Sequence, residues 1–301
     1  MSKSFLDKST MITQFNEYYN TVLSDLLENP DYLHLNLDMY IDKYGKECHG
    51  ISEKKNIIAI GGFGEIFECH VDTLSLIVKR IPINYPYNKY LSDDNIEVNN
   101  DVESGNFYYE YIDRFLNEII INIILQNKNT ELFCKLHGFK FIEDIQNEEI
   151  IGYFYIIMEN CGDKFNCNDV TLSNLLEWFI EIAEALKIMH NNNIVHNDIA
   201  YRNILVIDAH VKLIDFGMSE ITFDTELYEK DIYDFGKMML DIIERITLRD
   251  SRLWSKRLHV TDDLGDFMPL QPIIANIISS DVCPTIDQVL LDLHNILFKK
   301  N

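Results

Sequence analysis

Basic residues are scarce in this sequence compared with acidic ones. The 301 residues include 26 Lys and Arg against 49 Asp and Glu, so the formal net charge is −23. A protein that binds nucleic acid needs a basic face toward the phosphates, and this balance argues against a nucleic-acid partner. The charge fits a basic protein substrate, although an acidic surface that only keeps the protein in solution is the simpler interpretation.

The cysteines lack a paired spacing, since none forms a C-x-x-C motif. No apolar leader opens the chain, and no apolar run approaches the ~20 residues of a membrane span. We therefore expect reduced thiols, no membrane span and a cytoplasmic location, which is the host cytoplasm if the protein is viral or a secreted effector. The six cysteines are Cys48, Cys69, Cys134, Cys161, Cys167 and Cys283.

Glycine and proline are also few, with 12 and 6 residues, and no repeat or low-complexity tract appears. This composition argues against a disordered chain, and the length suits one two-lobed domain or two small ones. Short β-branched runs predict strands from Asn56 to Lys79, and two or three more strands are expected between Lys135 and Met158. Apolar residues recur at helical spacing at residues 113–125 and again from Thr171 onward. A strand-rich part before a helix-rich part predicts an α+β chain of two lobes.

Two segments in the second half carry the clearest chemistry. The first is IVHNDIAYRNIL at residues 194–205, and the second is KLIDFG at residues 212–217. Asn203 and Asp215 offer oxygen ligands to a hard cation such as Mg²⁺. Asp198 is suited to orient an acceptor hydroxyl group and take its proton.

Weaker signals lie upstream. A glycine cluster at residues 61–64 joins two strand-like segments, where backbone N–H groups can approach phosphate oxygens, although such glycines are more often structural. Lys79 lies near the end of an apolar strand, so its charge needs a phosphate or a carboxylate partner. Glu118 on the following helical segment offers that carboxylate, or it is an exposed helix residue.

The pair H-x-D-x-x-x-x-N and D-F-G resembles the catalytic loop and metal loop of protein kinases. The resemblance runs from about Ile58 to the C-terminus and implies a bilobal kinase fold, with lobes at residues 51–159 and 160–301. It implies ATP as cosubstrate with Mg²⁺, or Mn²⁺ as an alternative. Residues 1–50 would form a helical extension that packs on the kinase lobe or recruits a regulatory partner.

The resemblance also assigns roles to single residues. Asp231 would brace the catalytic loop from a buried helix, and His196 and Phe216 would stack in the internal spine. The implied catalytic residues are Asp198, Lys79, Glu118 and Arg202, and the implied metal ligands are Asn203 and Asp215. The implied nucleotide-binding residues are Ala59, Gly61, Gly62, Phe63, Gly64, Ile66, Ile77, Lys79, Met158, Glu159 and Cys161.

Several positions depart from the family pattern. Ala59 replaces the first loop glycine, Ile77 replaces the alanine that covers the adenine ring, and Asn122 replaces an apolar spine residue. A buried Asn needs hydrogen-bond partners. Asn197 replaces the Arg that often pairs with a phosphorylated activation loop, so we predict activity that does not depend on phosphorylation of that loop.

The segment between Asp215 and Asp231 is short and holds no A-P-E triplet, and Cys283 stands where the family carries the Arg that pairs with its Glu. This shortness resembles the small kinase of the tRNA-modifying KEOPS complex and divergent viral or bacterial-effector kinases. Ala200 replaces the Lys of serine/threonine kinases, while Arg202 matches the tyrosine-kinase pattern. The acceptor therefore stays open, with serine or threonine slightly favoured.

Three functions remain open. The preferred one is a protein kinase that transfers the γ-phosphoryl group of Mg-ATP to a protein hydroxyl. A kinase-fold phosphotransferase or ATPase acting on a small molecule, or within a complex, fits the reduced docking ledge. A pseudokinase scaffold fits Ala59, Ile77 and Asn122. A scaffold would need none of four residues that this sequence retains, namely Lys79, Asp198, Asn203 and Asp215.

Overall fold

The chain divides into two compact units in the computed structural model. One unit contains residues 1–113 and 136–158, and the other contains residues 114–135 and 159–301. The predicted extension at residues 1–50 lies outside the described residues, and the predicted lobe boundaries stay a prediction. The structure describes residues 57–61, 64–71, 74–82, 104–126, 128, 131–146, 149–164, 170–247, 265–280 and 282–300.

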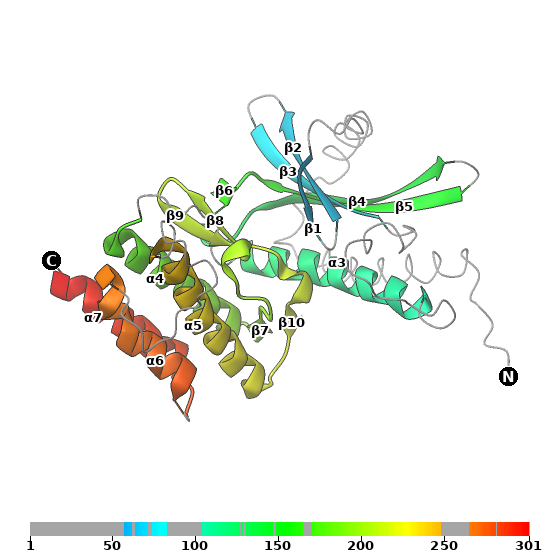
Figure 1. Cartoon of the computed structure of the whole chain (residues 1–301). Helices are drawn as coiled ribbons and strands as arrows, with labels where there is room; N and C mark the ends of the chain where they lie inside the picture. The colour runs from blue at the N-terminus through cyan, green and yellow to red at the C-terminus, as the bar shows by residue number, and fades with distance from the viewer. Residues whose placement is uncertain are drawn as a thin grey trace, which may run out of the picture. The chain divides into compact units, whose positions relative to one another are not determined.

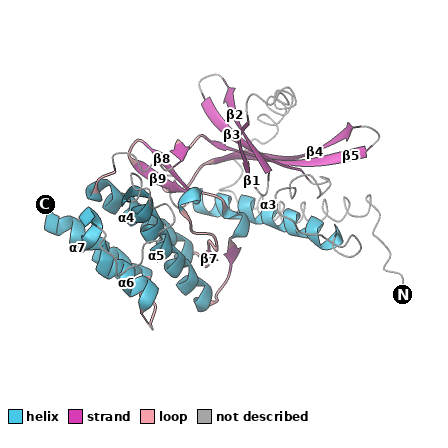
Figure 2. Cartoon of the chain, viewed as in Figure 1, coloured by secondary structure: helices cyan, strands magenta, loops and turns pink. Residues whose placement is uncertain are grey.

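The first unit is built on a five-stranded sheet, with strand order β1-β2-β3-β5-β4 (Figure 2). Neighbouring strands β1 and β2, β2 and β3, and β4 and β5 pair antiparallel. Leu76 and Val78 are buried, as the β-branched pattern of this stretch predicts. The strands are β1 Ile57–Gly61, β2 Gly64–Val71, β3 Leu74–Pro82, β4 Leu136–Gln146 and β5 Glu149–Glu159.

The second unit is mainly helical, with two small sheets of order β10-β7 and β6-β8-β9 (Figure 1). Helix α4 packs on α7 and β9, and α5 packs on α6. Helix α3 Ser104–Gln126 begins in the first unit and continues into the second, because the division falls after residue 113. The other longer elements are α4 Leu172–Asn191, α5 Thr225–Thr247, α6 Gln271–Ser279 and α7 Ile286–Lys300. The shorter ones are β6 Asp163–Lys164, β7 Ile194–Val195, η4 Tyr201–Asn203, β8 Ile204–Ile207, β9 His210–Leu213, η5 Phe216–Met218, β10 Glu220–Ile221 and η6 Gly265–Leu270.

Helix α4 has a defined start and a buried stripe, as its apolar spacing predicts. The Thr171 side chain accepts from the Asn174 backbone N–H, and the Asn174 side chain accepts from the Thr171 N–H, which completes a capping box. Phe179 of α4 meets Phe235 of α5 edge-on, with ring centroids 6.1 Å apart. This contact lies in the core that supports the motif-bearing loops.

The sequence located most of the described elements. Between Lys135 and Met158 it predicted two or three strands, and two are present. The helix predicted at residues 113–125 is longer and begins at Ser104. None of the described helices is long and apolar enough to cross a membrane.

Candidate active site

The loop between β7 and β8 brings together three of the predicted catalytic and metal residues. Asn203 Nδ2 donates to the Asp198 carbonyl oxygen at 2.8 Å and to Asp198 Oδ2 at 2.9 Å. Arg202 forms an ion pair with Asp198 Oδ1. The Asp198 side chain is 29% exposed, so its carboxylate is held by two neighbours and still reaches solvent.

Asp231 of α5 holds the backbone of this loop, as predicted. It is fully buried, and its Oδ2 accepts from His196 N at 2.7 Å while its Oδ1 accepts from Asn197 N at 2.9 Å. His190 Nε2 lies 3.2 Å from Oδ2 of the same carboxylate. A buried carboxylate with these partners fixes the loop more firmly than neutral turns would. The sequence did not single out His190, which lies at the end of α4.

His196 and Phe216, the two predicted spine residues, are in edge-to-face contact, with ring centroids 5.4 Å apart and an interplanar angle of 61°. His196 Nε2 donates to the Ile214 carbonyl oxygen at 3.2 Å, and Nδ1 accepts from Asp198 N at 3.3 Å. Burial lowers the pKa of His196, while Asp231, Asp198 and Asp215 act in the opposite direction. This bonding suits a neutral imidazole with its proton on Nε2.

Asp215 lies in the left-handed region, with φ of 69°. Non-glycine residues adopt this region rarely, and such strain gathers at functional sites. A β-carbon placed on Gly217 would lie 3.7 Å from Asp215 Oδ1 and 3.6 Å from Glu118 Oε2. Glu118, on α3, is buried. The carboxylate groups of Glu118 and Asp215 therefore both lie close to Gly217.

The chain after Asp215 is short and bonded through neutral groups. Asn197 Nδ2 donates to the Met218 carbonyl oxygen at 3.3 Å, and Ser219 Oγ donates to the His196 carbonyl oxygen at 3.1 Å. Strand β10 pairs with β7. The Tyr228 hydroxyl group, at the start of α5, donates to the Thr222 carbonyl oxygen. This segment is thus anchored to the catalytic loop by uncharged bonds.

Cys283 is the residue that the sequence predicts to replace the Arg of the family pattern. Its sulfur lies 3.7 Å from the Glu229 carbonyl oxygen of α5. Burial raises the pKa of its thiol, and Glu229 adds to the rise. The side chain is thus a neutral contact between α5 and the start of α7.

Predicted nucleotide-binding residues of the first unit line up across its sheet. Ala59 pairs in register with Ile66, and Ile66 pairs with Lys79. The Ile66 and Lys79 side chains share one face because the two residues are directly paired, and Ile77 belongs to the same face because it lies two residues from Lys79. Ala59 lies in strand β1, where alanine is acceptable.

Gly64 is the loop glycine whose lack of a side chain matters. Its φ is 150°, and a β-carbon there would lie 2.4 Å from the Arg80 carbonyl oxygen. Gly61 pairs with Gly64 across the turn. Gly62 and Phe63 lie outside the described residues.

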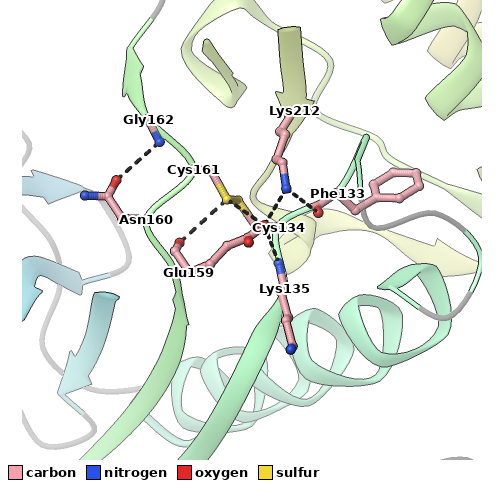
Figure 3. Close-up of a disulfide and its surroundings, with 8 residues drawn as sticks. All are labelled: Phe133, Cys134, Lys135, Glu159, Asn160, Cys161, Gly162 and Lys212. Carbon is pink, nitrogen blue, oxygen red and sulfur yellow. Dashed lines mark hydrogen bonds and ion pairs between the residues drawn. A yellow bond between two sulfur atoms is a disulfide. The ribbon is translucent and has the colours of Figure 1, made fainter. Parts of the chain in front are cut away.

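The last residue of β5, Glu159, belongs to a polar network that the sequence did not predict (Figure 3). Lys212 of β9 is 8% exposed. Its Nζ bonds Glu159 Oε1, and it donates to the Phe133 carbonyl oxygen at 3.3 Å. Lys135 N also donates to Glu159 Oε1, at 2.9 Å. A charged residue between the apolar Val211 and Leu213 was the one available signal.

The expectation of reduced thiols does not hold for one pair. Cys134 and Cys161 form a disulfide, with Cα atoms 6.1 Å apart. Their 27-residue separation gives no local pattern, which is why the sequence missed the pair. Cys283 is a free thiol.

The second unit can hold a divalent cation through Asn203 and Asp215. The side-chain nitrogen of Asn203, Nδ2, donates to Asp198, which leaves the side-chain oxygen, Oδ1, as the group for a ligand bond. The backbone carbonyl oxygen of Asn203 accepts from Ile214 N at 3.0 Å, so a main-chain hydrogen bond also joins the two segments. An amide oxygen and a carboxylate are suitable donors for Mg²⁺. Lys79 and Met158 belong to the first unit, and their relation to these ligands stays a prediction.

A family model described as "Protein tyrosine and serine/threonine kinase" matches residues 114–240. The matched residues include Glu118, Asp215, most of α5 and the β7–β8 loop held by Asp231, which we call the braced loop. They leave out β3, which carries Lys79.

Named kinases are similar to parts of this chain. L670, a candidate serine/threonine-protein kinase of Acanthamoeba polyphaga mimivirus, is 25% identical over 182 residues, which are 58% of this chain and 32% of L670. Serine/threonine-protein kinase Nek1 of Mus musculus is 39% identical over 83 residues, 25% of this chain and 7% of Nek1. L232 of the same mimivirus, another candidate kinase of that class, is 36% identical over 86 residues, 27% of this chain and 13% of L232. The chain thus spans a third or less of these relatives.

Proposed function

Because the chain belongs to the eukaryotic-type protein kinase superfamily, we propose that it transfers the γ-phosphoryl group of Mg-ATP to a hydroxyl group on a protein. The observation that carries the proposal is the braced loop. Asp198 and Asn203 are joined at 2.9 Å, and the buried Asp231 holds the loop backbone. A pair fixed in this way supplies the positioning on which phosphoryl transfer depends.

Each residue has a proposed task in the reaction. Asp198 orients the acceptor hydroxyl and takes its proton, and Arg202 shares the Asp198 carboxylate. Asn203 and Asp215 hold Mg²⁺, which neutralises charge on the phosphates when it is bound. Lys79 positions phosphates, and Glu118 holds Lys79.

Residues around the nucleotide are proposed from the family resemblance. Met158 lies at the gatekeeper position, the backbone of Glu159 and Cys161 binds adenine, and Ile77 covers the ring. Ile66 and the glycines of the loop at residues 61–64 lie over the phosphates. A nucleotide analogue that crosslinks near adenine should therefore label β5 or the residues directly after it.

We infer that activity does not require phosphorylation of the activation segment. A segment that waits for a phosphate needs a basic side chain to receive it, and Asn197 provides a neutral bond to Met218 instead. The protein made in bacteria and treated with phosphatase should therefore keep its full transfer rate. A rate that falls after phosphatase treatment would contradict this inference.

Serine and threonine are the proposed acceptors. The names of the viral and mouse relatives support this class. Ala200 and Arg202 match the tyrosine-kinase pattern, so acceptor identity needs direct measurement. Mass spectrometry of phosphorylated proteins from a cell lysate should find mainly phosphoserine and phosphothreonine, and a majority of phosphotyrosine would contradict the assignment.

The metal role has a matched control within the chain. Asp215 and Asp208 both have left-handed backbone, with φ of 69° and 48°, and Asn tolerates that region. Asp215→Asn should lower transfer from Mg-ATP at least about a hundredfold. Asp208→Asn removes the same charge from the exposed β8–β9 turn and should change little. Equal losses in both variants would contradict the role of Asp215.

A small-molecule acceptor is the second candidate. Helix α5 begins at Thr225, which follows Asp215 closely, so little chain remains to form a ledge for a peptide. Transfer to protein acceptors would argue against this candidate.

We propose a cytoplasmic setting, a basic protein among the substrates, and a regulatory partner for residues 1–50.

A further inference from the structure

We propose that Cys134 and Cys161 are a reversible redox-modification site that stiffens the segment following β5 when oxidised. Its effect on catalysis rests on the proposed function, whereas the modification itself does not. Cys134 lies two residues before β4, and Cys161 lies two residues after β5. The disulfide therefore closes the base of the β4–β5 hairpin (Figure 3).

The two cysteines lie next to two of the connections between the units, so a bond between them affects both connections. The backbone passes between the two units after residues 113, 135 and 158. Cys134 and Cys161 flank the second and third of these passages, and both belong to the second unit. A covalent bond between them fixes the spacing of two of the three connections at one place.

The surroundings accommodate the reduced as well as the oxidised state. Glu159 Oε1 lies 3.4 Å from the Cys161 sulfur, and the Glu159 carbonyl oxygen lies 3.6 Å from it. In the dithiol form the Cys161 S–H can donate to these oxygens, so reduction leaves no isolated polar group. In the disulfide form the sulfur has no proton, and Lys212 and Lys135 N still satisfy Glu159.

A metal ion is the competing occupant of this cluster. The ligand atoms of Cys134, Cys161 and Glu159 lie within 4.8 Å of one another. The buried Lys212 ammonium group already bonds the Glu159 carboxylate and would repel a cation there. Structural zinc also takes four protein ligands, and the described residues of this cluster offer three.

The oxidation has a balanced chemistry with a low-molecular-weight disulfide as oxidant. One cysteine thiolate attacks a sulfur of that disulfide, which forms a mixed disulfide and releases one small thiol. The second cysteine thiolate then displaces the other small thiol. Two protein sulfurs lose two electrons in total, the reagent is reduced to two thiols, and the two protein protons end on those thiols.

Burial sets the pace of the exchange. Cys134 is 4% exposed and Cys161 is 1% exposed, so a reagent reaches them only after local opening. The neighbouring Glu159 side chain is 31% exposed, so the two cysteines lie close to the protein surface. We expect modification over minutes to hours, the range of uncatalysed disulfide rearrangement.

The consequence for catalysis follows from the place of Cys161. Its backbone belongs to the proposed adenine-binding segment, and local adjustment of such segments often limits turnover. The disulfide restricts the adjustment of this segment. The oxidised protein should therefore transfer phosphate at least about threefold more slowly than the reduced protein, and reduction should restore the rate.

The test incubates the full chain with oxidised or reduced glutathione and maps disulfides by mass spectrometry after alkylation. Hydrogen exchange of peptides covering residues 159–164 is recorded on the same samples. Cys134→Ser removes the pair without touching the proposed nucleotide segment. Cys283→Ser is the matched control, because Cys283 is a free, partly exposed thiol.

We expect a Cys134–Cys161 peptide in the oxidised sample, slower exchange at residues 159–164, and loss of both effects in Cys134→Ser but not in Cys283→Ser. Absence of that peptide would overturn the site, and so would stoichiometric zinc in the purified protein. An oxidised protein with an unchanged rate would overturn the effect on turnover. A chain that forms the pair but transfers no phosphate retains the modification site and refutes the proposed function.

Discussion

Asn122 is a buried polar residue whose side-chain nitrogen has a hydrogen-bond partner and whose side-chain oxygen has none among the described residues. It is 2% exposed on α3, and its Nδ2 donates to the Glu118 carbonyl oxygen at 2.7 Å. Its Oδ1 is buried and has no hydrogen-bond partner among the described residues. Sequence reasoning identified this position as one that needs partners, and the structure supplies one of two.

Replacing Asn122 by Leu should raise stability. Leucine has a similar size and removes the cost of the buried carbonyl oxygen, so we expect a gain of about 1–3 kcal/mol in the free energy of unfolding. Urea denaturation monitored by circular dichroism measures it. Asn122→Asp places a charge at the same point and should destabilise the protein. A less stable Asn122→Leu protein would contradict the account of this residue.

His196 should make the second unit sensitive to acid. Burial lowers its pKa, so the folded protein keeps it neutral at a pH where the unfolded chain binds a proton. Stability should then fall as pH drops below about 6.5, by at most about 1.4 kcal/mol per pH unit. Urea denaturation from pH 7.5 to 5.5 measures the fall, which should be smaller in His196→Gln.

His210 provides a control of opposite sign. It is exposed, and the hydrogen bond to Glu181 raises its pKa, so it contributes stability at low pH that disappears as pH rises through the folded-state pKa. His210→Gln should therefore steepen the loss of stability toward acid. If the stability of the wild-type protein and that of His196→Gln fall equally as pH drops, His196 is not the cause of the acid sensitivity.

At the scale of elements, helix α5 connects the loop brace to the helical core. Asp231 holds the catalytic loop, and one turn later Gly236 lets α6 approach closely. A β-carbon on Gly236 would lie 2.4 Å from Ile277 Cγ2 and 3.0 Å from Ile277 Cβ. The glycine thus serves packing between helices, and its conformation is ordinary.

Gly236→Ala should cost about 1–3 kcal/mol of stability, because overpacking outweighs the helix propensity of alanine. Ile277→Ala opens space, so the double variant should lose less than the sum of the two single losses. Thermal or urea denaturation gives all three values. Glu229→Ala, on an exposed position of the same helix, controls for the alanine itself. Additive losses would show that the predicted contact is absent.

Elements with a local signal could be predicted, and contacts between distant segments could not. The spacing of apolar residues predicted α4, and the motif located Asp198, Asn203 and Asp215. Lys212 and Glu159 are 53 residues apart, and neither the spacing nor the composition around them indicates the pairing. The same reason applies to Cys134 and Cys161.

At the scale of the whole molecule, charge is the dominant property. A net charge of −23 creates a negative field that attracts basic partners and is screened by salt. The residue patterns predicted a strand-rich part followed by a helix-rich part, because strand and helix spacings occur in separate stretches of the chain. The predicted packing or partner of residues 1–50 stays a prediction, because these residues lie outside the described part of the chain.

Transfer to a basic protein should depend strongly on ionic strength. Raising salt from about 20 to about 300 mM should increase the KM for a basic acceptor several-fold, because screening removes long-range attraction. The KM for an uncharged peptide should change much less. Steady-state kinetics at several salt concentrations measures both values. Equal salt dependence for the two acceptors would contradict a role for the acidic surface.

The most direct test of the central claim is single-turnover transfer of labelled γ-phosphate to a protein acceptor by wild type and Asp198→Asn. Nucleotide affinity is measured on the same preparations. Loss of an acid–base group should slow transfer by about a thousandfold while the Kd for nucleotide stays within about threefold. Transfer by Asp198→Asn at the wild-type rate, or no transfer by either protein, would contradict the claim that this loop catalyses phosphorylation.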